Sequence, residues 1–181
     1  HGGGFRILSK DTHWVMALAF ARRGFVVVNV EYRLAPRHPF PAAVEDVCAA
    51  YAWTTAHAHE HGGDVERLVV AGESAGANLA TVLSIAACYE RDEPYARAVF
   101  ATGVAPRVAL PACGIFQVTD PARFARRRPD MSPLVADRIH EVSEGYLGEA
   151  LHERAEARAA HYDLADPLLV FERGEPPARP L

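Results

Sequence analysis

The sequence lacks the features that mark membrane proteins and nucleic-acid-binding proteins. No uninterrupted apolar run comes near the roughly 20 residues that a membrane-spanning helix needs, so we expect no membrane span. The formal net charge is only -4, and the one dense basic cluster, Arg126–Arg128, lies close to acidic residues. We therefore interpret this cluster as a solvated face and expect no nucleic-acid partner.

Cysteine is scarce as well. The three residues Cys48, Cys88 and Cys113 are odd in number, widely spaced and set among apolar neighbours. This pattern argues against a disulfide framework and against a zinc site, and it favours three buried free thiols.

The first half of the chain alternates between helix patterns and strand patterns. With 181 residues, of which 50% are hydrophobic, the chain can bury one sizeable core, so we expect a single domain over residues 1–181. The order of elements is typical of a doubly wound α/β fold with a mainly parallel sheet. We predict a helix over 11–23 that ends at Gly24, a buried parallel strand over 25–32, a helix from Pro41 to Gly62, a strand over 67–72 and a helix over 75–90.

The second half is less regular. One strand is expected near Val108–Gly114, where prolines make its ends hard to place. Residues 119–161 are rich in arginine and glutamate and carry helix patterns with no strand between them. We expect this stretch to be a helical insertion, or lid, over the sheet.

The stretch GESAG at 72–76 carries the clearest chemical signal. A serine with glycines two positions before and after it, between an apolar strand and a helix, is the pattern of a nucleophile elbow. Side chains at Gly72 or Gly76 would collide with the neighbouring elements, and the sharp turn exposes Ser74 at the end of the sheet. The simpler alternative is a turn in which Ser74 caps the following helix.

The stretch HGGG at the start of the chain supports the same chemistry. Glycines let backbone amides come close to a ligand, so the N–H groups of Gly3 and Gly4, with that of Ala75, can hold the oxyanion of a tetrahedral intermediate. A flexible loop or a phosphate-binding turn would also explain the glycines, but neither explains why they accompany the elbow.

A third stretch, EYRLAPRHPFPAAVEDV at 31–47, lies between the other two. Together with HGGG before it and GESAGANLA after it, it resembles the hormone-sensitive-lipase-like esterases, which carry YRLAPE, PFPAA and the serine elbow in this order. The resemblance covers at least residues 1–88. It implies the α/β-hydrolase fold, and it implies a serine carboxylesterase that acts on small or short-acyl esters.

The resemblance also assigns roles to individual residues. It implies that Ser74 is the nucleophile and that Gly3, Gly4 and Ala75 form the oxyanion hole. It also implies that His1 orients the HGGG stretch at 1–4, called the glycine loop below, without being the catalytic base. Two residues depart from the family pattern: Glu73 stands where aspartate is usual, and Arg37 where glutamate is usual. Neither change removes a catalytic group.

The rest of a catalytic triad is expected outside these residues. In this fold the triad runs in the order serine, acid, histidine, and each follows a later strand. The resemblance places both the acid and the histidine beyond Leu181, and it places a strand before His1. We therefore expect an internal part of a longer esterase, with a sheet incomplete at both ends and little activity of its own.

Histidines within the chain offer weaker alternatives. His140, His152 and His161 follow Ser74 in a permissible order, and His161 has Asp163 nearby. His140 and His152 lie among charged residues of the expected helices, where a solvated histidine is the simpler interpretation, and His161 is the least improbable base. The group His57, His59 and His61 alternates along a helix end, so its members point apart and a metal site is not expected.

We expect no metal and no organic cofactor, because acyl transfer to a serine needs neither. The expected partner is a small ester, and the sequence leaves the oligomeric state open. A member of the same fold without a working triad could instead bind a small molecule as a receptor.

Overall fold

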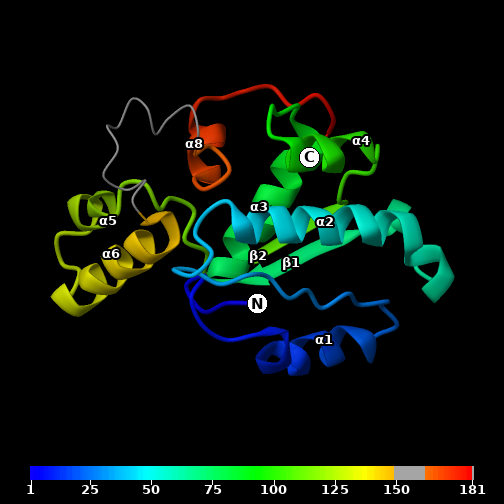
Figure 1. Ribbon diagram of the computed structural model, residues 1–181, viewed down its shortest axis with the longest axis horizontal. Coiled ribbons are helices and arrows are strands. Elements are labelled where there is room, and N and C mark those ends of the chain that lie inside the picture. The colour runs from blue at the N-terminus through cyan, green and yellow to red at the C-terminus, as the bar shows by residue number, and fades with distance from the viewer. Residues whose placement is uncertain (149–161, 181) are drawn as a thin grey trace.

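The structure of the protein is a computed structural model that describes residues 1–148 and 162–180 (Figure 1). A parallel pair of strands lies at its centre, with β1 (Val69–Glu73) beside β2 (Val108–Ala112). The two strands pair along their full length, from the first residue of each to the last. The expected mainly parallel α/β sheet is therefore confirmed in its central pair.

Helices connect and cover these strands. The chain passes from β1 to β2 through α3 and α4, and α2, α3 and α4 pack against one another while α3 also lies on both strands. Figure 1 shows the extended segment that precedes α2 running between α1 and the two strands. The helices are α1 (Trp14–Ala21), α2 (Ala42–His57), α3 (Ala75–Cys88), α4 (Pro94–Ala101), α5 (Ala122–Arg127), α6 (Pro133–Leu147) and α8 (Pro167–Glu172), with short 3-10 turns η1 (Lys10–His13), η2 (Ala58–His61) and η3 (Val65–Arg67). None of the helices in these described residues is both long enough and apolar enough to cross a membrane.

Helix α3 is the centre of the core. Twelve of its 14 residues are buried, and most of these are small, so neighbouring elements can approach it from several sides. Its one buried amide, Asn78, donates hydrogen bonds to the carbonyl oxygens of Ile115 (2.7 Å) and Ala165 (3.0 Å). The helix that follows the elbow is therefore fixed to the chain after β2 and to the segment before α8.

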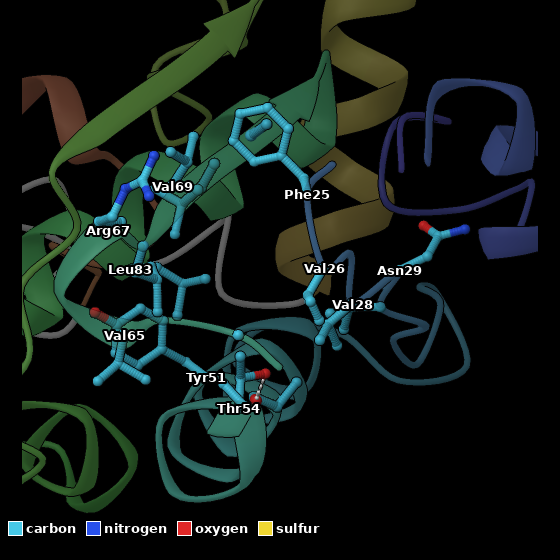
Figure 2. A pocket seen from close by; sticks show the side chains of 18 of the residues that line it. Phe25, Val26, Val28, Asn29, Tyr51, Thr54, Val65, Arg67, Val69 and Leu83 are labelled. Atoms are coloured by element: carbon cyan, nitrogen blue, oxygen red, sulfur yellow. Dashed lines mark hydrogen bonds between the residues drawn. The ribbon is translucent and has the colours of Figure 1, made fainter. Parts of the chain in front are cut away.

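The prediction of a buried parallel strand over 25–32 is wrong. Residues 25–32 are extended but form no strand, and the side chains of Phe25, Val26, Val27 and Val28 are 37–50% exposed. A cavity of about 930 Å³ separates this segment from β1 (Figure 2). Because the cavity keeps the two backbones apart, residues 25–32 have no ladder partner in the described part of the chain.

The second half follows the expected order. Strand β2 falls within the predicted range, and the described part of residues 119–161 contains α5 and α6 with no strand. The last part of this expected insertion, residues 149–161, lies outside the described residues. His152 and His161 also lie outside them.

The cysteines are free, as expected, but only Cys48 and Cys88 are buried. Burial raises the pKa of the Cys48 thiol to about 12. The expectation of a buried Cys113 is wrong, because Cys113 directly follows β2, whose five residues are all exposed.

One buried aromatic pair joins the glycine loop to α6. Phe5 and Tyr146 are both fully buried, and their rings stack with centroids 3.7 Å apart. The Tyr146 hydroxyl has no hydrogen-bond partner among the described residues. A buried hydroxyl without a partner costs free energy on folding.

We therefore expect Tyr146→Phe to raise the free energy of unfolding by about 1 kcal/mol, because it removes an unpaired donor and opens no cavity. Tyr146→Ala should lower it by about 3–5 kcal/mol, because the ring fills space against Phe5. Urea denaturation followed by circular dichroism measures both changes. A clear loss of stability in Tyr146→Phe would show that the hydroxyl has a partner.

Candidate active site

Ser74 lies at the turn between β1 and α3. Its backbone has φ 54° and ψ -114°, a combination that is strained for a residue with a side chain. Its N–H donates to the carbonyl oxygen of Ala112 (2.8 Å), and its own carbonyl oxygen accepts the first hydrogen bonds of α3 from Ala77 and Asn78. Its side chain does not cap the helix, so the interpretation of Ser74 as a capping serine is wrong.

Two glycines make this turn possible. A Cβ at Gly72 would lie 2.0 Å from the carbonyl oxygen of Gly76, and a Cβ at Gly76 would lie 2.8 Å from that of His1. Backbone atoms occupy both places, so only glycine fits at either position. The elbow geometry expected from GESAG is present, with the steric reason that the sequence pattern gave.

The glycine loop lies directly against the elbow. His1 packs over Gly76, and a Cβ at Gly2 would lie 2.3 Å from Oε2 of Glu73. On its other side, a Cβ at Gly4 would meet a methyl group of Val142 on α6 at 2.9 Å. The loop is thus held between Glu73 and Gly76 of the elbow on one side and helix α6 on the other.

His1 is fixed by several contacts. Its side chain is buried, its ring stacks on Tyr32 with centroids 4.0 Å apart, and its Nε2 lies 3.0 Å from a carboxylate oxygen of Glu31. The Tyr32 hydroxyl donates to the His1 carbonyl oxygen at 2.7 Å. Burial, reinforced by the charges of Glu31 and Glu73, raises the pKa of Tyr32, so the hydroxyl stays protonated as this donor.

The stretch 31–47 supports the glycine loop. Arg33 pairs with Asp46 and Glu45 on α2, and the N–H of Ala35 donates to the carbonyl oxygen of Phe5 at 2.8 Å. Arg37, which departs from the family pattern, is exposed. The segment therefore acts as a brace between α2 and the glycine loop.

Of the alternative histidines, only His140 lies within the described residues. His140 is exposed on α6, and His57 stacks on Trp53 with centroids 4.8 Å apart. Asp163, the expected partner of His161, pairs with Arg173 and Arg91. Among residues 1–148 and 162–180, no three histidine, cysteine or acidic side chains are placed so that they could hold a metal ion.

The sequence did not indicate one residue of this site, His13. Nε2 of His13 accepts the N–H of Gly2 at 3.2 Å and lies 3.3 Å from Oε2 of Glu73. The sequence shows only a histidine near the start of a helix. No spacing rule indicates that this helix returns to the glycine loop.

An apolar groove runs beside the glycine loop. It has a volume of about 320 Å³ and is lined by Ile115 after β2 and by residues of α6, including Val142, which also faces Gly4. The remaining lining residues are Leu134, Val135, Arg138 and Ile139. A groove of this size takes only a small apolar group.

Comparisons with known proteins agree with this geometry. The family model described as alpha/beta hydrolase fold matches residues 1–179. The carboxylesterase NlhH of Mycobacterium tuberculosis is 47% identical over 85 residues, which cover 46% of this chain and 27% of that protein. The hormone-sensitive lipase of Ictidomys tridecemlineatus is 40% identical over 155 residues, which cover 84% of this chain and 19% of that protein.

Among solved structures, an esterase of Pyrobaculum calidifontis is similar, with a TM-score of 0.69 and 31% identity. The match covers 93% of this chain and 50% of the esterase. The chain therefore spans half or less of the length of each of these relatives.

Replacement of the elbow glycine tests the steric argument. We expect Gly72→Ala to lower the free energy of unfolding by more than about 3 kcal/mol, because the new Cβ meets backbone atoms that cannot give way. Gly103→Ala is the matched control. Gly103 has open space around it and a φ of 74°, so its replacement should cost only about 1 kcal/mol of backbone strain. Equal losses in urea denaturation would contradict the close contact.

Proposed function

The chain belongs to the alpha/beta hydrolase fold family, within which its resemblance to hormone-sensitive-lipase-like esterases is confirmed, and from this premise we propose a serine carboxylic-ester hydrolase. The proposal assigns to this chain the nucleophile and the oxyanion hole. One observation carries it: the strained Ser74 turn lies against a glycine-rich loop that packs on Glu73 and Gly76, on either side of the serine.

The proposed reaction is a two-step acyl transfer. The Ser74 hydroxyl attacks the ester carbonyl carbon while a histidine takes its proton, and the N–H groups of Gly3, Gly4 and Ala75 stabilise the oxyanion. The tetrahedral intermediate then expels the alcohol, which takes the proton from the histidine. Water attacks the acyl-enzyme in the same way and releases the acid and free Ser74.

The buried N-terminal end of α3 supports this assignment. Ala75 is the first residue of the helix, and its N–H belongs to the set that lacks helical partners and carries partial positive charge. A negative oxygen next to Ser74 would therefore be favoured by the helix as well as by the glycine loop.

The apolar groove beside Gly4 supports a small acyl group. Val142 touches the glycine loop and also lines the groove, so an ester held at the loop could place its acyl carbons there. The volume of about 320 Å³ lies at the lower end of the range for small-molecule sites. We propose a short-chain ester as the substrate.

We further propose that the general base and its acid partner lie outside residues 1–181. Within the described residues, the Ser74 hydroxyl makes no hydrogen bond to a histidine, and His13 is engaged with Gly2 and Glu73. Loss of the base and acid typically removes about 10⁶-fold of the rate and leaves roughly 10³-fold over water. The 181-residue chain is then expected to turn over esters very slowly.

A fluorophosphonate probe tests the nucleophile directly. We expect slow labelling of the 181-residue chain at Ser74, none in Ser74→Ala, and unchanged labelling in Ser132→Ala, which removes an exposed serine on α6's N-terminal cap. Added imidazole should speed the labelling of Ser74, because it can stand in for an absent base. Mass spectrometry identifies the labelled peptide.

The other outcomes separate the alternatives. Fast labelling without imidazole would place the base within the 181 residues. A folded chain that binds small esters saturably but never labels at Ser74, even with imidazole, would favour the receptor-like alternative.

A further inference from the structure

His13 makes an unusual set of contacts at the start of the glycine loop. It closes η1, immediately before α1, and its ring is 22% exposed. Its Nε2 lies 3.2 Å from the backbone nitrogen of Gly2 and 3.3 Å from Oε2 of Glu73. Its Nδ1 lies 2.9 Å from the hydroxyl oxygen of Thr12.

The hydrogen bonds of Thr12 decide which nitrogen of His13 carries the proton. The Thr12 hydroxyl donates to the carbonyl oxygen of Ser9 at 2.7 Å, so its oxygen has only lone pairs to offer His13. In a neutral ring the proton therefore lies on Nδ1 and is donated to Thr12. Nε2 is then an acceptor, and it takes the N–H of Gly2.

The same Nε2 cannot serve Glu73 and Gly2 at once. A hydrogen bond to the Glu73 carboxylate needs a proton on Nε2, whereas the hydrogen bond from Gly2 needs a free lone pair there. The neutral ring binds Gly2 and leaves Glu73 without a donor. The protonated ring binds Glu73 and leaves the Gly2 N–H without an acceptor.

We propose that His13 is a positioning residue of the glycine loop. Its neutral imidazole holds the Gly2 N–H, whereas its protonated imidazole releases that N–H and donates to Glu73 instead. The inference rests on the proposed function, because it gives the loop a role in the reaction of Ser74. Gly2 directly precedes the proposed oxyanion donors Gly3 and Gly4, so its orientation sets theirs.

Other charged groups act on this switch from each side. Glu73 reaches it from β1, and Glu31 reaches it through the His1 ring, whose centroid is 5.8 Å from that of His13. Within η1, the backbone N–H of Lys10 donates to the second oxygen of Glu31 at 3.2 Å.

The contact between Glu73 and His13 depends on the length of the Glu73 side chain. Its Oε2 occupies the space beside Gly2 where a Cβ would lie 2.3 Å away, so only glycine at position 2 lets the carboxylate reach His13. Aspartate, which the related esterases usually carry at this position, is one methylene shorter. Glu73→Asp should therefore keep the charge near the elbow but lose the contact with Nε2.

Nuclear magnetic resonance of the 181-residue chain tests the contact without reference to catalysis. At pH 8 we expect Nδ1 of His13 to be protonated and Nε2 to be bare. Between about pH 5 and 8, where imidazoles exchange their proton, the Gly2 amide resonance should shift with the same midpoint as the His13 ring.

His13→Gln is the informative variant, because its amide oxygen still accepts from Gly2 and its amide nitrogen still donates to Glu73, but neither titrates. The Gly2 step should vanish in this variant and persist in His57→Gln, which alters a histidine stacked on Trp53 on another helix. A Gly2 step that survives in His13→Gln has another origin and overturns the proposal, as does a proton on Nε2 at pH 8.

Fluorophosphonate labelling then links the contact to the serine. In His13→Gln we expect the labelling rate at pH 8 to stay within about threefold of the unaltered chain, with a flatter profile toward pH 5.5. His13→Ala should slow labelling roughly threefold to tenfold, the size of one neutral hydrogen bond.

The two readouts fail separately. Coupled titration of Gly2 and His13 without any labelling of Ser74 would sink the proposed hydrolase and leave the loop contact standing. Labelling that is equal in all His13 variants at every pH would overturn the positioning role while leaving the nucleophile in place.

Discussion

Close contact between backbones at the elbow is the constraint on which the rest of the site depends. Gly72, Gly76 and His1 meet where a single methyl group would not fit, so β1, α3 and the glycine loop share one point of contact. Because each partner is backbone, none of them can move aside by a change of rotamer. The strained φ of Ser74 persists because these neighbours define the turn from both ends.

The core maintains this contact from behind. Helix α3 is buried on nearly all sides, and most of its own buried residues are small. Asn78, one turn after the serine, donates to carbonyl oxygens from two later segments. The carboxylate of Asp166 accepts the N–H groups of Val118 and Thr119, which fixes the chain after β2. Burial raises the pKa of Asp166, and these donors partly offset that effect. The end of the sheet is thus defined by hydrogen bonds that reach across 37 to 87 residues of sequence.

Charge is concentrated around the glycine loop. His1, His13, Glu31 and Glu73 lie within one small region, joined by the stacked ring of Tyr32 and by backbone donors. The cluster meets the glycine loop at Gly2, directly before the glycines whose amides the proposed reaction would use.

The features that rest on local sterics and short-range order could be predicted from the sequence. The glycines of GESAG and HGGG, the helices around them and the β1–α3–β2 order follow from chain pattern, because backbone crowding and hydrophobic periodicity act over a few residues. Only the tertiary structure decided whether an apolar run such as 25–32 finds strands beside it, and it shows a cavity instead. The same holds for Cys113, which follows an exposed strand, and for His13, which contacts Gly2 although a helix pattern begins there. Burial and long-range contacts depend on what lies across space, and no local pattern encodes that.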